Sequence, residues 1–207
     1  MKRIFSSCLL LWLSVAAAFA QKALLDETAA ALKRGGVEAA FTASASRNGQ
    51  SLGTTTGTIS VKQNKFKVVA DGLTTWFDGK TQWTLLKGSD EVNVTTPTAA
   101  ELQQINPYHF VNLYKKGYTA TQRTVSAGGV TQPEVTLKAQ NASAAIQTMV
   151  IVINKTTHLP ISVKVVMKKG TTTDIRLTNV RNNRKFDDAL FRFNASDYPK
   201  ITVNDLR

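Results

Sequence analysis

The sequence predicts a mainly β (α+β) protein: an unclosed antiparallel β-barrel, or half-barrel, with short helices covering a concave hydrophobic cavity. Apolar and polar residues alternate in short segments from Val37 onward, which is typical of half-buried strands. Turn sequences such as Asn48-Gly49 and Asp78-Gly79 separate these segments. About nine to eleven strands are expected, and strand twist curls a sheet of that size.

The first twenty residues have the pattern of a secretory signal peptide. Lys2 and Arg3 form a charged start, residues 4–18 are apolar, and Ala18-Phe19-Ala20 has the small residues of a cleavage site. The apolar run is shorter than a comfortable membrane span. We therefore expect cleavage after Ala20 and export of residues 21–207 to the periplasm as a single domain.

The cysteine content and the net charge limit which functions the exported domain can have. Cys8 is the only cysteine and lies in the signal peptide, so the exported domain would have no disulfide, thiol nucleophile or thiolate ligand. A cysteine-free exported domain fits a bacterial periplasm. The formal charge of +12 falls to +10 without the signal peptide. Lysines and arginines are scattered, which favours a role in solubility and leaves anionic partners such as lipid headgroups as the alternative.

Helical patterns occur in three places. Residues 21–34 carry apolar residues at helical spacing and are followed by Gly35-Gly36, which predicts an amphipathic helix at the start of the domain. Thr98 and Glu101 have the spacing of a capping box. Asn106-Pro107 then predicts the start of a short helix that ends at Gly117.

The remaining chain is predicted as strands and turns. The early strands alternate in period two, and Asp78-Gly79 is their strongest hairpin signal. The later strands are expected at 118–125, 134–139, 149–154, 161–168 and 172–180.

The sequence offers no candidate catalytic or metal site. His109 and His158 are its only histidines, and neither stands at a metal-ligand spacing. Asp187-Asp188 is better suited to capping a helical turn than to acid–base chemistry. No nucleophile elbow, phosphate-binding loop or dinucleotide fingerprint occurs. We therefore expect no enzyme activity and no cofactor. We also expect no nucleic acid partner, because the aromatic residues alternate with polar ones as in a core or cavity.

Several segments, taken in chain order, resemble the LolA-type periplasmic lipoprotein carriers. That family has a G-x-[VIL]-x-[VIL]-K strand, a strand with phenylalanine, a D-G-K-x-x-W hairpin, a helical insert, and F-x-F and V-x-D elements near its end. The matching segments are Gly57-Thr58-Ile59-Ser60-Val61-Lys62, Phe66-Lys67, Asp78-Gly79-Lys80-Thr81-Gln82-Trp83, the Asn106-Pro107 helix, Phe191-Arg192-Phe193 and Val203-Asn204-Asp205. The resemblance covers essentially all of the expected exported domain.

The resemblance implies a carrier, or chaperone, that serves outer membrane biogenesis. Family members hold the acyl chains of lipoproteins in a hydrophobic cavity, collect them from an inner-membrane ABC transporter and deliver them toward the outer membrane. We expect a monomeric periplasmic carrier of acylated lipoproteins or other lipids, with an inner-membrane transporter and an outer-membrane acceptor as partners. A sensor or regulator of envelope lipids or lipoproteins on the same half-barrel is the alternative.

Large apolar side chains of the strands and of the Asn106 helix are the candidate ligand contacts. For any one of them core packing is the simpler explanation, because an alternating strand buries its apolar face anyway. Together they indicate a concavity that short helices do not fill, which suits an oily ligand. The candidates are Phe66, Val68, Trp76, Trp83, Leu85, Phe110, Leu113, Tyr114, Val163, Val165 and Leu177.

One position departs from the family pattern. Proteobacterial carriers have K-R-P after the early strand, and that arginine takes part in closing the lid. Here Lys62 is followed by Gln63-Asn64. Gln63 cannot make a charged, bidentate contact. We therefore expect any lid control to be looser or to use another residue.

Overall fold

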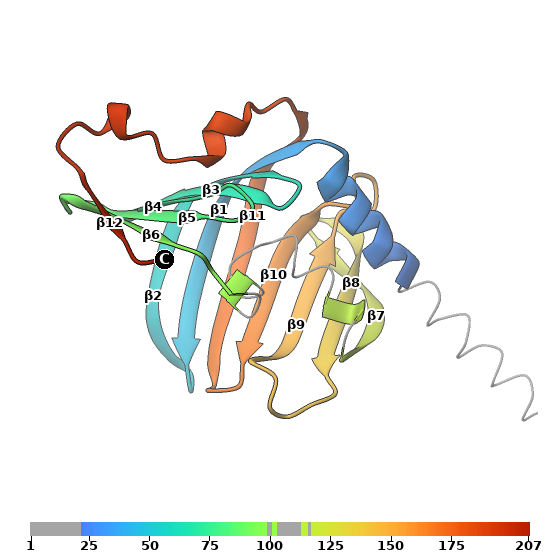
Figure 1. The fold of residues 1–207 in the computed structure, drawn as a ribbon. Helices are drawn as coiled ribbons and strands as arrows, with labels where there is room; N and C mark the ends of the chain where they lie inside the picture. The colour runs from blue at the N-terminus through green and yellow to red at the C-terminus, as the bar shows by residue number, and fades with distance from the viewer. Residues whose placement is uncertain (1–21, 99–100, 103–112, 116) are drawn as a thin grey trace, which may run out of the picture.

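The computed structural model describes residues 22–98, 101–102, 113–115 and 117–207. Twelve strands form one sheet (Figure 1). They are β1 (Gly36–Arg47), β2 (Gln50–Lys62), β3 (Lys65–Ala70), β4 (Leu73–Phe77), β5 (Gln82–Leu86), β6 (Glu91–Thr95), β7 (Tyr118–Ala127), β8 (Val130–Ala139), β9 (Ile146–Ile153), β10 (Pro160–Met167), β11 (Thr171–Arg184) and β12 (Thr202–Asp205). Among the described residues, three 3₁₀ turns accompany them: η1 (Leu113–Lys115), η2 (Asp188–Phe191) and η3 (Ala195–Asp197).

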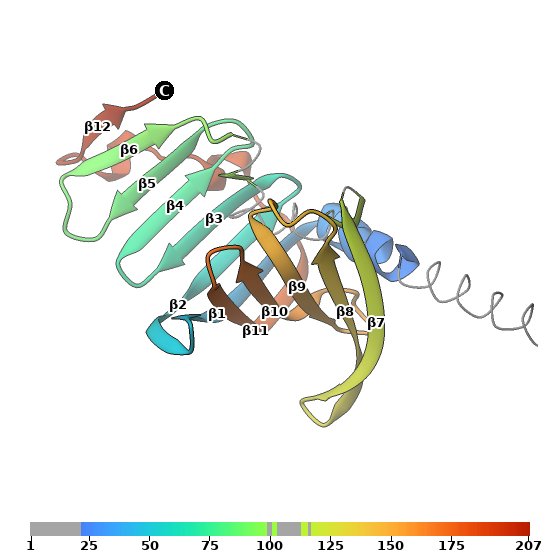
Figure 2. The same cartoon turned by 90° about the horizontal axis from the view of Figure 1, so that it is seen from below.

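The sheet is open at two edges. Its order is β12-β6-β5-β4-β3-β2-β1-β11-β10-β9-β8-β7, so β7 and β12 are the edge strands and the barrel does not close. Neighbouring strands are antiparallel except for β12, which pairs with β6 in parallel. Figures 1 and 2 show the sheet curling, with β3–β6 turned across the direction of β1, β2 and β11. The predicted unclosed, mainly β architecture is confirmed.

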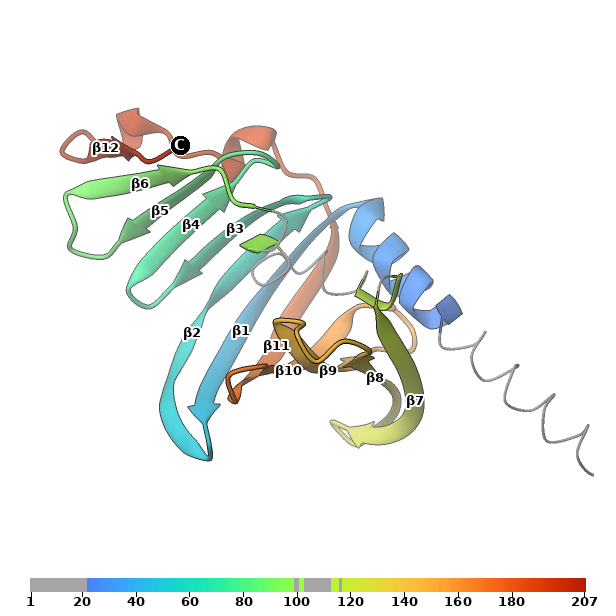
Figure 3. The same cartoon turned by 60° about the horizontal axis from the view of Figure 1, so that its bottom comes forward.

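The N-terminal helix covers one side of this sheet. It spans residues 22–34, as the apolar spacing predicts, and buries Leu25, Ala29 and Leu32 at positions i, i+4 and i+7. These residues belong to one cluster with apolar side chains of β8, β9 and β10, and with Leu113 of η1. Figure 3 shows the helix and η1 together on the inner side of the curl, which we call the concave face.

Strand register carries the concave face across the whole sheet. Directly opposed residues in neighbouring strands share a face, and successive residues alternate between faces. The pairs Val135↔Ile151, Ile151↔Val163 and Val163↔Ile175 extend it from under the helix to β11. On the other side of β1, the pairs Val37↔Val61, Val61↔Phe66 and Phe66↔Phe77 extend it to β4.

The C-terminal segment before β12, residues 186–201, covers part of the opposite side, which we call the outer face. It lies above β3–β6 in Figure 1. Trp76 of β4 is buried there, with ring centroids 5.6 Å from Phe193 and 5.9 Å from Tyr198. The C-terminal segment therefore covers the outer side of β4, where it buries Trp76.

The predicted short elements are partly confirmed. The Thr98 amide donates to Glu101 Oε2 at 2.7 Å and the Glu101 amide donates to Thr98 Oγ1 at 3.3 Å, which is the expected capping box. Asp187 caps η2 by accepting from the Ala189 amide at 2.9 Å. The predicted helix from Asn106 falls mostly outside the described residues, of which 113–115 form η1. No helix among the described residues is long and apolar enough to span a membrane.

Candidate ligand-binding face

A band of half-buried apolar side chains crosses the middle of the concave face. On one side of it lies the buried cluster under the N-terminal helix, and on the other lies the buried cluster of Val61, Phe66 and Phe77. The band runs over β3, β2, β1 and β11, and its members are neighbours by register. They are Phe41, Ile59, Val68, Ile175 and Leu177.

Gly57 makes room for Phe41, the one aromatic residue of this band. It lies opposite Phe41 in the β1–β2 register. A methyl group on Gly57 would lie 2.9 Å from Phe41 Cζ and 2.3 Å from the Val69 carbonyl oxygen. Phe41 therefore lies against the glycine backbone, which gives a physical reason for the first residue of the Gly57–Lys62 segment.

Charge is kept off this part of the concave face. Around the band, the concave-face positions of β1, β2, β3 and β11 are apolar residues, glycine or threonine, such as Thr55 and Thr173. Arg47 lies farther along this face, at the end of β1, where its Nε donates to Thr171 Oγ1 at 3.1 Å. Charged residues of the same region, among them Lys67, Lys164 and Arg176, alternate with them and lie on the outer face. An apolar surface without charges suits hydrocarbon, since a charge placed there would lose hydration without gaining a partner.

Seven of the sequence-predicted site residues lie on the concave side. Phe66 is buried, with its ring centroid 5.2 Å from that of Phe77. Tyr114 of η1 packs on the helix-covered cluster, and its hydroxyl donates to Asp26 of the helix. The concave-side set is Phe66, Val68, Leu113, Tyr114, Val163, Val165 and Leu177. Phe110 lies outside the described residues. A role in ligand binding stays a prediction for all of them.

The structure corrects the expected placement of Trp76, Trp83 and Leu85. Phe77 faces the concave side with Phe66, so its neighbour Trp76 faces outward, together with its β5 partner Trp83. Leu85 follows two residues later on the same outer face. The tryptophans around the Asp78-Gly79 turn therefore lie on the face that the C-terminal segment covers, because Phe193 and Tyr198 supply the apolar contacts of Trp76.

Sequence reasoning missed Phe41, Ile59 and Ile175. Each stands in a segment whose alternation predicts a strand, so the pattern already separated them from their polar neighbours. What it lacked was the β1–β11 register, which pairs Phe41 with Leu177 and Ala43 with Ile175. That pairing joins residues far apart in the chain, and only then do the three become members of one band.

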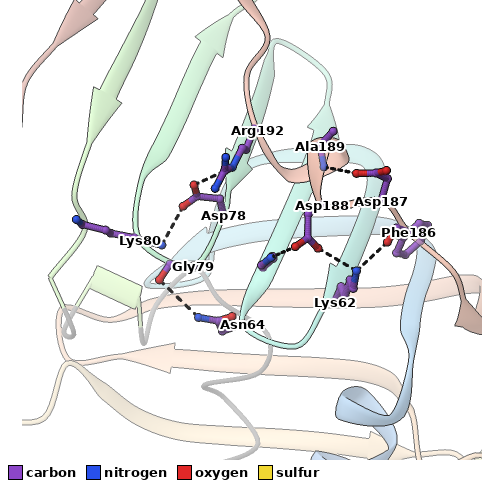
Figure 4. Close-up of polar contacts among 11 residues, drawn as sticks. Lys62, Asn64, Asp78, Gly79, Lys80, Phe186, Asp187, Asp188, Ala189 and Arg192 are labelled. Carbon is purple, nitrogen blue, oxygen red and sulfur yellow. Dashed lines mark hydrogen bonds and ion pairs between the residues drawn. The ribbon is translucent and has the colours of Figure 1, made fainter.

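Polar contacts hold the C-terminal segment near the β2–β3 turn (Figure 4). Lys62 Nζ donates to the Phe186 carbonyl at 2.8 Å and to Asp188 Oδ1 at 2.9 Å. Lys65 Nζ donates to Asp188 Oδ2 at 2.6 Å. The hydrogen bonds from Lys65 and Lys62 lower the pKa of Asp188 from its ordinary value of 3.8 to about 2. Lys62, the last residue of the Gly57–Lys62 segment, thus holds the start of the C-terminal segment against the sheet.

Asp78 makes a second polar link to the same segment. Its Oδ1 accepts from the amides of Lys80 at 3.0 Å and Thr81 at 2.9 Å, which fixes the β4–β5 loop. Its Oδ2 lies 3.2 Å from Arg192 Nε. Figure 4 shows that Asp78 contacts Arg192 from the β4–β5 loop, whereas Lys62 contacts Asp188 from the β2–β3 turn. The D-G-K-x-x-W and F-x-F elements are therefore in contact in the fold.

Gln63 occupies the two-residue turn between β2 and β3. Its φ is +56°, and its side chain is exposed. The turn is closed by the pair Lys62↔Lys65. Gln63, which stands where the family pattern K-R-P has its arginine, is thus an exposed turn residue in this protein.

The chain matches a known family over most of its length. The sequence model of the family "Outer membrane lipoprotein carrier protein LolA" matches residues 13–187. No match was found among the curated proteins.

Solved structures show the same fold at low sequence identity. An uncharacterized conserved protein from Thermus thermophilus is 12% identical, with a TM-score of 0.59, over 88% of this chain and 96% of its own. A DUF1329 family protein from Desulfovibrio piger is 13% identical, with a TM-score of 0.50, over 85% of this chain and 97% of its own. At such identities the likeness shows the shared architecture.

Proposed function

The chain belongs to the LolA family of outer membrane lipoprotein carrier proteins, and from this premise we propose that it is a periplasmic carrier of acyl chains. Lipoproteins are the proposed cargo, with other acylated lipids as the wider class, moved from the inner toward the outer membrane. The half-buried apolar band of the concave face is the observation that carries this proposal.

The half-buried state of the band suits reversible binding. Each methylene removed from water gains about 0.8 kcal/mol, so full burial of a chain of about sixteen carbons would gain roughly 12 kcal/mol. A carrier that kept all of this gain would not release its cargo. The side chains of Phe41 and Leu177 are half-buried. A surface of this kind covers a chain on one side and keeps only part of the gain.

Export and partners complete the proposal. Cleavage of the signal peptide after Ala20 would release residues 21–207 into the periplasm as one domain. An inner-membrane transporter would load the carrier and an outer-membrane acceptor would unload it, as the family membership suggests. The proposed step is binding and release without covalent chemistry.

The first test is to identify what the protein carries. Protein purified from a native periplasm would be extracted with organic solvent and examined by mass spectrometry. We expect acylated lipoprotein fragments or acyl lipids in near-stoichiometric amount. Protein that is pure, folded and free of acyl chains, and that also takes up no fluorescent fatty acid, would contradict the proposal.

A transfer assay separates a carrier from a sensor. Donor vesicles with a quenched fluorescent lipid are mixed with acceptor vesicles and increasing protein. A carrier raises the transfer rate in proportion to its concentration. Binding without any transfer would instead support the sensor alternative on the same half-barrel.

A further inference from the structure

A basic pocket lies where the N-terminal helix meets the sheet. It is a hollow of about 280 Å³ lined by the end of the helix, the start of β1, the β2–β3 turn and the end of β11. Five of its lining residues are cationic: Lys33, Arg34, Lys62, Arg184 and Lys185. Its lining, all of it within the described part of the chain, contains no Asp or Glu.

Nearby carboxylates offset only part of this charge. Asp188 pairs with Lys62 at 2.9 Å, and Glu38 pairs with Arg184 at 3.4 Å. Arg34 and Lys185 are exposed, and neither is within ion-pair distance of a carboxylate among the residues the structure describes. Like charges around one hollow repel one another, so an anion bound there would be favoured.

Backbone features hold the pocket in shape. Gly36 packs against Phe186: a methyl group on Gly36 would lie 2.4 Å from Phe186 Cδ2 and 2.5 Å from the Arg184 carbonyl oxygen. Asn183 has a φ of +55°, and the β1–β11 register shifts between Gly36 and Glu38. This irregularity leaves Arg184 opposite Gly36, so that its side chain lies on the outer face beside Lys62.

We propose that this pocket binds the phosphate of an anionic phospholipid headgroup when the protein meets a membrane surface. A phosphate diester is compact enough for the hollow, and arginine pairs with phosphate oxygens in a bidentate way. Basic clusters are drawn to anionic membranes, and the net charge of the exported residues acts in the same direction.

The position of the pocket is compatible with contact between the protein and a membrane. Gly36 and Lys62 line the pocket, and their chain neighbours Val37 and Val61 are buried on the concave face. A headgroup held here would bring the bilayer to the rim of the sheet. Among the described lining residues Phe186 is the only aromatic one, and its ring centroid lies 5.9 Å from that of Phe191. Because this ring packs within the protein, the lining described here offers no free ring on which a nucleic acid base could stack.

The test measures binding to vesicles of phosphatidylcholine with and without about a third phosphatidylglycerol, by flotation. Arg34→Gln/Lys185→Gln removes two charges from the pocket, at side chains that are exposed. Lys168→Gln/Lys169→Gln is the matched control, because it removes two exposed charges at the turn on the other end of β11. Arg34→Lys/Lys185→Arg keeps the charge and guards against a loss caused by misfolding.

We expect the wild type to float with the anionic vesicles only. Near an anionic surface each basic residue contributes about fivefold in affinity, so the pocket variant should bind roughly tenfold or more weakly. The control should change less than about twofold, and the charge-keeping variant should bind like the wild type. Equal loss in pocket and control variants would overturn the proposal in favour of net charge alone.

Soluble anions give the second arm. Inorganic phosphate should reduce vesicle binding more than sodium chloride of the same ionic strength does. Phosphate binding that is lost in the pocket variant, with unchanged vesicle binding, would assign the pocket to a soluble phosphate and overturn membrane contact. Pocket-dependent binding of polyglutamate without vesicle binding would overturn it in favour of an acidic protein. Fatty acid uptake by the concave face is a separate readout and should be unchanged in the pocket variant.

Discussion

Gly57 is a residue whose surroundings leave no space for a side chain. Its Cβ position lies 2.3 Å from the Val69 carbonyl oxygen, which is backbone and cannot rotate away, and 2.9 Å from Phe41 Cζ. Gly57→Ala should therefore lower the free energy of unfolding by about 1–3 kcal/mol through overpacking. Urea unfolding followed by circular dichroism measures it. Thr58→Ala, at the exposed neighbouring position, is the control and should change stability by less than about 0.5 kcal/mol.

Asp188 gives the protein a predictable acid dependence. Hydrogen bonds from Lys65 and Lys62 lower its pKa to about 2, whereas an unfolded chain titrates this carboxyl near its ordinary 3.8. Because the native state binds the proton less tightly, the ion pairs stabilise it fully above about pH 5 and cease to do so as pH falls toward 2. The wild type should thus unfold at higher urea than Asp188→Asn near neutral pH.

The pH series decides whether this ion pair is the cause. The difference between the urea midpoints of wild type and Asp188→Asn should shrink as pH falls from about 4 to 2. A difference that persists unchanged at pH 2 would show that the ion pairs with Lys62 and Lys65 do not account for it.

At the residue scale, hydrogen bonds between residues close in the chain were predictable, whereas the face of the sheet on which a side chain lies was less so. The Thr98–Glu101 capping box depends on residues three apart, and the sequence suffices for it. The direction of Trp76 depends on whether its side of β4 is covered by helix 22–34 and its neighbours or by Phe193 and Tyr198. Alternation shows that Trp76 and Phe77 face opposite ways, and it does not show which way is inward.

The C-terminal segment is the element whose role the sequence hid. Its F-x-F pattern fits a strand as well as the short turns η2 and η3 that the structure contains. Its contacts are with Lys62, Asp78 and Trp76, more than a hundred residues earlier in the chain. By contrast, the N-terminal helix was predictable, because its apolar spacing and the following glycines are local signals.

Trp76 tests how much this element contributes. It is 3% exposed and packs edge-on against Phe193 and Tyr198. Trp76→Ala should lower the free energy of unfolding by about 3–5 kcal/mol. Trp83→Ala, at the half-buried partner position in β5, should cost clearly less. Chemical denaturation of both variants checks this, and equal losses would contradict the proposed docking of the segment on Trp76.

At the scale of the whole molecule, the sequence predicts approximately how many strands follow one another along the chain. It does not predict which distant strands pair in the sheet. Consecutive hairpins follow from turns such as Asn48-Gly49, where both residues have positive φ. The β1–β11 pair and the parallel β12–β6 pair join segments that no short-range signal connects. Those pairs decide which apolar residues meet on the concave face, and so they decide the candidate site.

The central claim is that the concave face, and not the outer face, holds acyl chains. Leu177 and Thr178 are neighbours in β11, and the first lies on the concave face while the second lies on the outer face. Leu177→Asp and Thr178→Asp therefore add the same charge at the same place in the chain but on opposite sides of the sheet. Circular dichroism would first establish that both variants are folded.

The most direct measurement is the affinity of delipidated wild type and of these two variants for a fluorescent fatty acid. Leu177→Asp should bind at least about tenfold more weakly, which is about 1.4 kcal/mol, because it places a charge among half-buried apolar side chains. Thr178→Asp should bind within about twofold of the wild type. Undiminished binding by folded Leu177→Asp, or an equal loss in both variants, would contradict acyl binding on the concave face.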